Sequence, residues 1–193
     1  MERRYNESRL NSEGGKIRGT ASPTYDGTPG TEYELFPGVF ERFAPGAFDQ
    51  YLKNSPDVVA LVNHDKSAIL GRTSAGTLHL KTDAKGLHYE VDPPDTQYAR
   101  DLLTSIQRGD IRGSSFAFHP TEVEWTRDGV KDVRLVRAAT VHDVSPVTVP
   151  AYGGSSVGLR SAEERAAIEK ERDEFHARLE TEKRVSKLAS LLK

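Results

Sequence analysis

The decamer GDIRGSSFAF occupies residues 109–118 and determines how the chain around it is expected to fold. Residues 95–108 before it repeat apolar side chains every three or four positions, as on one face of a helix, and Gly109 suits the end of that helix. The aromatic and small residues that close the decamer alternate as in a β-strand. The decamer therefore predicts a helix that leads through a glycine turn into a strand carrying Ser114 and Ser115.

The two serines differ in the face of the strand that they occupy. Ser114 shares a face with the two phenylalanines of the decamer, whereas Ser115 shares the opposite face with Ala117. If the aromatic rings fill the core, the Ser115 hydroxyl points into a cleft with space for a substrate. Backbone N–H groups around Gly113 and Ser115 could then form an oxyanion hole. From this segment alone, two ordinary turn serines are the favoured interpretation.

A serine hydroxyl is a weak nucleophile at neutral pH, so catalysis also needs a base and a group that orients the base. His64 follows the apolar run at residues 58–62, the position expected where a buried strand ends. The segment VHDVSPVTVPAY at residues 141–152 has the pattern of another strand and contains His142 and Asp143. Serine, histidine and carboxylate thus come from three separate segments, which is the usual way in which a serine-protease triad is assembled.

Asp143 is the candidate third member of such a triad. On a regular strand the odd-numbered positions from Val141 share one face, which is apolar apart from Asp143 and Ser145. A half-buried carboxylate needs a cation or a hydrogen-bond donor, and His64 is the natural partner. The alternative is an ion pair with an arginine, of which two are candidates: Arg72 and Arg137. His142 points to the other face unless a bulge intervenes, and is the runner-up third member.

A metal site is a further alternative for the two His-Asp dipeptides, His64-Asp65 and His142-Asp143. Paired His-Asp dipeptides occur in metal-dependent phosphohydrolases, but there the ligands lie on helices of all-α folds. Both dipeptides of this chain follow strand-like runs. The pattern therefore favours the triad, and we expect neither a metal nor a cofactor.

The composition excludes several classes of protein. The chain has 193 residues, a formal net charge of -2 and no cysteine. This charge lacks the basic excess of a general nucleic-acid binder, and no disulfide or thiolate site can form. The polar first residues lack the apolar core of a signal peptide, and no run of about 18 apolar residues is present. We expect a protein that is not exported and binds neither nucleic acid nor membrane.

Strand-like segments outnumber helical ones. Alternating apolar residues flank the turns at residues 83–86 and 128–129, which predicts two hairpins. The pattern predicts a mainly β fold with peripheral helices, of the α+β class. Residues 1–15 are polar and expected to be flexible, and residues 16–160 form the domain.

Residues 161–193 are expected to form a separate charged helical tail. Ser161 begins a capping-box pattern, and neither proline nor glycine follows it. The apolar positions make only a thin stripe along this helix. We interpret the tail as an assembly or docking segment.

Five segments in this order resemble the caudoviral prohead serine proteases, the lambdoid-type phage enzymes that mature capsids. The resemblance covers residues 16–155 and is carried by KIRGTAS from Lys16, PGAFDQYL from Pro45, NHD from Asn63, GDIRGSSFAF from Gly109 and VHDVSPVTVPAY from Val141. It implies that Ser115 is the nucleophile and His64 the base. The acidic residue before VSPVTVPAY is usually glutamate in relatives and is Asp143 in this chain.

The resemblance also implies a fold and a place of action. The family is similar to the herpesvirus maturation protease, which implies a β-barrel ringed by helices, a possible homodimer, and a second histidine such as His142 as third member. Relatives cleave scaffold or major capsid protein precursor segments, and themselves, inside the assembling prohead in the host cytoplasm. Self-cleavage could remove the tail. A catalytically inactive scaffold or capsid-assembly factor with the same fold is the alternative function.

Overall fold

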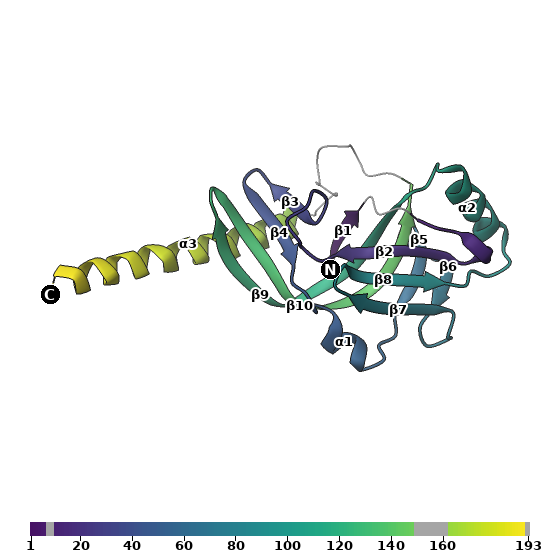
Figure 1. Cartoon of the computed structure of the whole chain (residues 1–193), viewed down its shortest axis with the longest axis horizontal. Helices are drawn as coiled ribbons and strands as arrows, with labels where there is room; N and C mark the ends of the chain where they lie inside the picture. The colour runs from purple at the N-terminus through teal and green to yellow at the C-terminus, as the bar shows by residue number, and fades with distance from the viewer. Residues whose placement is uncertain (7–9, 149–161, 192–193) are drawn as a thin grey trace. The chain divides into compact units, whose positions relative to one another are not determined.

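The computed structural model describes residues 1–6, 10–148 and 162–191. The chain divides into two compact units, residues 1–158 and 159–193 (Figure 1). The predicted capping box at Ser161 and the residues 149–152 of the VHDVSPVTVPAY segment lie outside the described residues.

Unit 1 is mostly β-structure. Its strands are β1 (Glu2–Asn6), β2 (Ile17–Pro23), β3 (Glu32–Phe36), β4 (Val39–Phe43), β5 (Val59–Val62), β6 (Asp65–Arg72), β7 (Leu78–Asp83), β8 (Gly86–Val91), β9 (Gly113–Asp128) and β10 (Lys131–Val147). Its helices are the short α1 (Asp49–Lys53), α2 (Gln97–Arg108) and a 3-10 turn at Glu13–Gly15. Both α-helices lie at the margins of the β-structure (Figure 1). The predicted mainly β, α+β class is confirmed.

The strands form two sheets. One has the order β1-β9-β10-β4-β3, and β5 joins it by pairing in parallel with β10 and antiparallel with β6. The other is the antiparallel sheet β2-β8-β7, whose strands lie side by side in Figure 1. Within the described residues neither sheet closes on itself, so the expected barrel is not confirmed.

The hairpin of β9 and β10 forms the centre of the larger sheet. Its strands are long enough to pair with β1 and β4 at different points along their length. Gly129 turns the chain between them with φ 60°, in the left-handed region that glycine adopts without a steric penalty. Both hairpins predicted from alternating residues, β7 with β8 and β9 with β10, are confirmed.

Aromatic rings fill the core on one face of β9. Phe116 and Phe118 stack with their ring centroids 5.0 Å apart, and Phe43 of β4 meets them edge-on at 5.5 and 5.2 Å. Phe48 stacks on Phe43 at 5.4 Å. These four buried rings confirm that the phenylalanine face of β9 points inward.

The helix before the decamer ends where the sequence indicates. Ala99, Leu102 and Ile106 of α2 are buried, which is the apolar face expected from their spacing. Gly109 is the C-cap with φ 82°, and its N–H donates to the Ile106 carbonyl. The glycine turn thus directs the chain into β9.

The N-terminus differs from the flexible segment predicted for residues 1–15. Residues 2–6 form β1, which pairs with β9 beside the two serines. Arg4 donates to Glu41 of β4 at 2.5 Å, and Arg134 of β10 donates to Glu41 at 2.6 Å and to Glu2 at 3.0 Å. These charged groups are buried and neutralise one another. Burial alone would raise the pKa of Glu41, but the two guanidinium groups lower it below its usual value.

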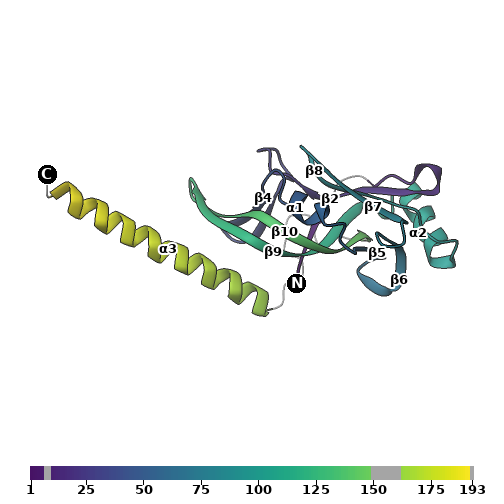
Figure 2. The same ribbon diagram turned by 90° about the horizontal axis from the view of Figure 1, so that it is seen from below.

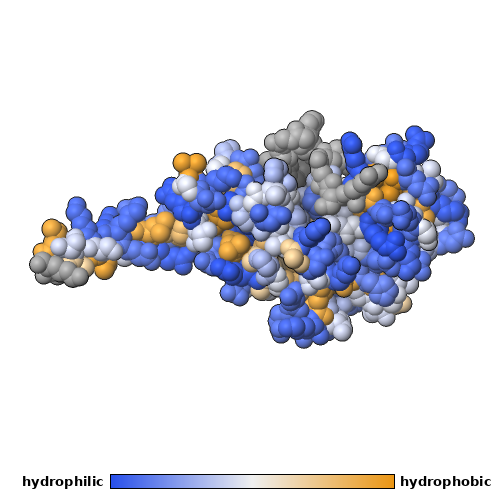
Figure 3. Space-filling model, viewed as in Figure 1, coloured by the Kyte–Doolittle hydropathy of each residue, from blue (hydrophilic) through white to orange (hydrophobic). Residues whose placement is uncertain are grey.

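The described residues of unit 2 form one long helix, α3 (Ala162–Leu191). Its surface in Figure 3 is mostly hydrophilic, with apolar side chains at intervals, and the exposed apolar residues near its end are Val185, Leu188 and Leu191. The same helix is seen from below in Figure 2. None of the described helices is both long enough and apolar enough to span a membrane.

Candidate active site

Three side chains from separate segments form one chain of hydrogen bonds. His64 Nε2 lies 2.7 Å from Ser115 Oγ, and His64 Nδ1 lies 2.5 Å from Asp143 Oδ1. A carboxylate accepts hydrogen bonds, so Nδ1 carries the ring proton and Nε2 is left as the acceptor for the serine O–H. This is the tautomer that a general base needs.

His64 lies in the tight turn between β5 and β6. Val62 pairs with Asp65, so Asn63 and His64 are the two central residues of the hairpin turn. Their φ values are 51° and 59°, the left-handed pair that defines a type I′ turn. Asparagine is common at the first of these positions, whereas glycine is preferred at the second. The histidine therefore holds a backbone conformation that costs free energy, as residues at functional sites often do.

Hydrogen bonds of both central residues attach this turn to β10 and to Thr148, the residue after it. Asn63 N–H donates to the Pro146 carbonyl at 3.0 Å, and Thr148 N–H donates to Asn63 Oδ1 at 2.9 Å. His64 N–H donates to Ser145 Oγ at 3.2 Å. The turn and β10 therefore form one rigid support for the imidazole.

A β-bulge at His142 determines where Asp143 points. Val141 lies opposite Phe118 and Asp143 lies opposite Ala117, so His142 is the extra residue. Residues directly opposite each other in a sheet project from the same face. Val141 therefore faces the aromatic core, whereas Asp143 faces the Ser115 side. The expectation that all odd-numbered positions share one face is wrong, because the bulge shifts the alternation.

Asp143, His142 and the two candidate arginines differ in their contacts. Arg72 donates to Asp57 at 3.0 Å and Arg137 to Glu124 at 2.6 Å, so each arginine has another carboxylate as its partner. His142 is exposed at the bulge. Asp143, which is only 7% exposed, makes the hydrogen bond to His64.

Ser114 lies in a different environment from Ser115. Its hydroxyl is fully buried between the two sheets and lies 2.9 Å from the Tyr89 hydroxyl. Burial raises the pKa of the Tyr89 phenol. A β-carbon at Gly19 would lie 2.7 Å from both Ser114 Oγ and the Tyr89 ring, so glycine provides the space for this pair. The predicted separation of the two serines by strand face agrees with these contacts.

The backbone of Ser115 has a strand on each side. Ser115 lies opposite Tyr5 of β1 and opposite Ser145 of β10. Its N–H therefore faces a neighbouring strand, whichever ladder it joins. This arrangement does not support the expectation that the Ser115 N–H contributes to an oxyanion hole. The sequence pattern could not reveal this, because it contains no sign that β1 pairs there.

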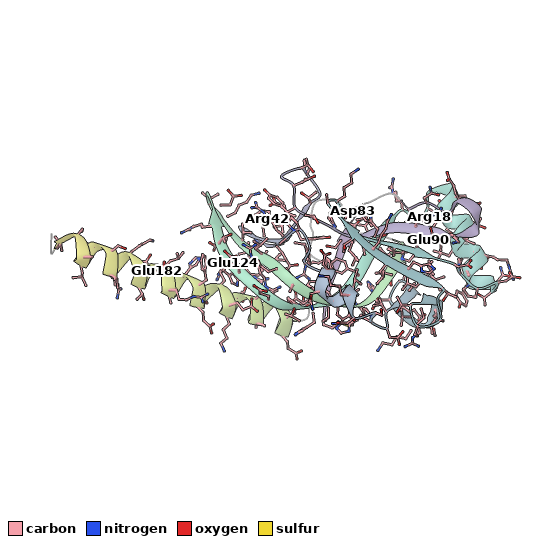
Figure 4. The ribbon with its side chains drawn as sticks, turned by 60° about the horizontal axis from the view of Figure 1, so that its bottom comes forward. Arg18, Arg42, Asp83, Glu90, Glu124 and Glu182 are labelled. Atoms are coloured by element: carbon pink, nitrogen blue, oxygen red, sulfur yellow. The ribbon has the colours of Figure 1, made fainter. Side chains whose placement is uncertain are left out.

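A second hydroxyl, imidazole and carboxylate lie on the three-stranded sheet. Thr20 Oγ1 is 3.1 Å from His88 Nδ1, and His88 Nε2 is 2.8 Å from Asp83 Oδ1. Asp83 is labelled in Figure 4, which also shows Arg18 and Glu90 on the same sheet. Among the residues that the structure describes, no group of three or more potential ligands could hold a metal ion.

Comparison with known proteins adds one finding to this geometry. A family model described as caudovirus prohead serine protease matches residues 7–170. The matched region includes Ser115, His64 and Asp143. Neither the curated proteins nor the solved structures contain a match to the chain.

Proposed function

Since the chain belongs to the caudovirus prohead serine protease family, we propose that Ser115 is its nucleophile, His64 its general base and Asp143 the carboxylate that orients the base. The observation that supports these roles is the continuous set of hydrogen bonds from Ser115 Oγ through the imidazole to Asp143 Oδ1. Serine endopeptidases with a serine–histidine–carboxylate triad use these groups in this order.

In the first half of the reaction the serine is acylated. Ser115 Oγ bonds to the carbonyl carbon of the scissile peptide while its proton moves to His64 Nε2. The tetrahedral intermediate then collapses, the C–N bond breaks, and the proton passes from Nε2 to the leaving amine. Throughout, the Asp143 carboxylate accepts the Nδ1–H bond and stabilises the imidazolium that forms.

In the second half, water releases the acyl group. His64 Nε2 takes a proton from the water, whose oxygen bonds to the acyl carbon. The ester bond to Ser115 Oγ then breaks, and the proton returns to the serine. Because the carboxylate is nearly buried, water competes little for its bond with the imidazole.

The substrates that we propose are the scaffold region, the major capsid protein precursor, and the chain itself. The site of action is the assembling prohead in the host cell. These assignments rest on the family. A protease of this kind must meet its substrates at high local concentration, which enclosure with them in one particle provides.

Mass spectrometry of the chain co-expressed with a capsid precursor tests the proposal. Discrete precursor fragments are expected for the wild type and none for Ser115→Ala. Ser114→Ala is the matched control, because it removes a hydroxyl one residue away on the other face of β9. Continued cleavage by Ser115→Ala would overturn the assignment of the nucleophile.

The second candidate is a catalytically inactive assembly factor with the same fold. The long charged helix α3 favours it, because such a helix could dock on a partner without any chemistry. Covalent labelling of Ser115 by a fluorophosphonate decides between the two functions. An assembly factor would not activate the serine, whereas the protease must.

A further inference from the structure

Ser145 lies at the centre of the site, although the chemistry proposed above does not use it. It is fully buried and lies opposite Ser115 in the ladder between β9 and β10. Its side chain therefore projects from the same face as the Ser115 hydroxyl. A fully buried hydroxyl on that face must have polar partners, because leaving it without one would be costly.

The hydrogen-bond partners of Ser145 are the backbone of His64 and the carboxylate of Asp143. Its Oγ accepts a hydrogen bond from the His64 backbone N–H at 3.2 Å and donates one to Asp143 Oδ1 at 3.1 Å. It also lies 3.4 Å from His64 Nδ1. A hydroxyl has one proton to donate, and the carboxylate, which can only accept, receives it. Ser145 thus forms hydrogen bonds with both the backbone N–H of His64 and Asp143 Oδ1, the oxygen that accepts the hydrogen bond from the His64 ring.

This connection matters because His64 is held in a left-handed conformation, with φ 59°. The backbone of such a residue returns to a more common conformation unless its surroundings hold it. The hydrogen bonds of Asn63 hold the preceding residue, whereas the Ser145 hydroxyl holds the backbone N–H of His64 itself. Its loss would allow the imidazole to shift relative to Ser115.

We propose that Ser145 is a positioning residue that fixes the distance and angle between His64 and Ser115. This inference rests on the proposed serine-protease function. It predicts that removing the Ser145 hydroxyl slows the reaction of Ser115 with a serine-directed probe without weakening the binding of that probe.

A fluorophosphonate probe separates these two effects. During labelling Ser115 Oγ bonds to phosphorus, fluoride leaves, and the hydroxyl proton passes to His64 Nε2. The maximal inactivation rate, kinact, therefore reports proton transfer, and the half-saturating concentration, KI, reports binding. For Ser145→Ala we expect kinact to fall about 10- to 100-fold, the effect of a displacement of about 1 Å, and KI to change less than about twofold.

Two further comparisons isolate the hydroxyl. Ser114→Ala removes an equally buried serine oxygen from the other face of β9 and should keep the wild-type kinact. Ser145→Thr and Ser145→Val have the same shape, so any steric cost is common to both. Only the threonine retains the hydroxyl, and we expect its kinact to exceed that of the valine variant about tenfold or more.

The NMR resonance of the His64 Nδ1 proton gives a readout that a merely structural serine would not affect. We expect it to move or broaden in Ser145→Ala and to remain in place in Ser114→Ala. The inference is overturned if Ser145→Ala keeps kinact within about twofold of the wild type, or if the threonine and valine variants react equally. If the wild type itself is not labelled, the proposed function fails instead.

Discussion

Two sets of hydrogen bonds in this protein join a hydroxyl to a carboxylate through an imidazole. They differ in how far apart their residues lie in the sequence and in how deeply their carboxylates are buried. In the first, Ser115, His64 and Asp143 come from three distant segments. In the second, Asp83 and His88 flank a single hairpin turn, and Thr20 lies on the neighbouring strand. We call them the Ser115 array and the Thr20 array.

The carboxylates of the two arrays differ most. The Asp143 side chain is 9% exposed and that of Asp83 is 50% exposed. Asp83 also accepts the Lys85 backbone N–H at 2.7 Å, as turn aspartates commonly do. Water and the local turn therefore share the Asp83 carboxylate with His88. A set of hydrogen bonds alone does not make a catalytic site; burial and an independently held imidazole distinguish the Ser115 array.

The largest difference between the arrays should appear when the hydroxyls are removed. We expect Ser115→Ala to lower the rate of precursor cleavage about 10⁴- to 10⁶-fold, because the proposed acyl intermediate forms on Ser115 Oγ. Thr20→Ala should cleave at the wild-type rate. Quantifying the precursor fragments over time for both variants tests this, and equal effects of the two substitutions would refute the comparison.

Removing the charge of each carboxylate should give the next largest difference. Asp143→Asn keeps the shape but no longer stabilises the imidazolium or its tautomer, so we expect the inactivation rate with a fluorophosphonate to fall about 10⁴-fold. For Asp83→Asn we expect no change beyond about twofold, because the proposed reaction does not use the Thr20 array. A small effect of Asp143→Asn would return His142 to consideration as third member.

Glycine, compared with alanine, should change the stability of the fold in opposite directions at residues 64 and 88. At residue 64 both His64→Gly and His64→Ala delete the ring, but only alanine keeps a β-carbon at φ 59°. We expect the glycine variant to be more stable by about 1 kcal/mol. At residue 88, on the regular strand β8, the glycine variant should be less stable than alanine by about 0.5–1 kcal/mol. Chemical denaturation of the four variants measures this, and the same order at both residues would contradict the strained turn.

The smallest expected effect concerns acid stability at the Thr20 array. Hydrogen bonds from His88 and from Lys85 N–H lower the pKa of Asp83 below its ordinary 3.8. A lowered carboxyl pKa stabilises the fold at pH values above the unfolded-state pKa, and this contribution is lost as the pH falls through the folded-state pKa. The stability difference between wild type and Asp83→Asn should therefore shrink on acidification below about pH 4. Thermal melts from pH 5 downward measure it, and a difference that grows would be inconsistent with these bonds.

Local patterns predicted much of the site because each depends on a few adjacent residues. Strand alternation assigned Ser115 and Ser114 to opposite faces, and the glycine at residue 109 indicated the helix end. The bulge at His142 left no mark in the pattern, because one extra residue in a strand looks like any other position. The alternation therefore placed Val141 and Asp143 on one face, which the bulge separates, although the half-buried carboxylate that it indicated is present.

Long-range pairings could not be predicted from the sequence. Residues 1–15 are polar, which is typical of a flexible end, yet Arg4 is satisfied by Glu41, 37 residues away. The Thr20 array depends in the same way on the register of β2 against β8. The sequence pattern predicted only that Ser145 lies on a strand. The role proposed for it depends on its hydrogen bond with His64 in the turn between β5 and β6.

Locating the fluorophosphonate on the chain tests the central claim most directly. Trypsin is expected to cleave after Arg112 and Arg127 and to release the peptide that begins Gly113-Ser114-Ser115. Fragmentation should show the two-residue N-terminal fragment unmodified and the three-residue fragment carrying the phosphonyl group. Labelling should disappear in Ser115→Ala and persist in Ser114→Ala. A phosphonyl group on Ser114, or none on the chain, would contradict the assignment of Ser115 as the activated serine.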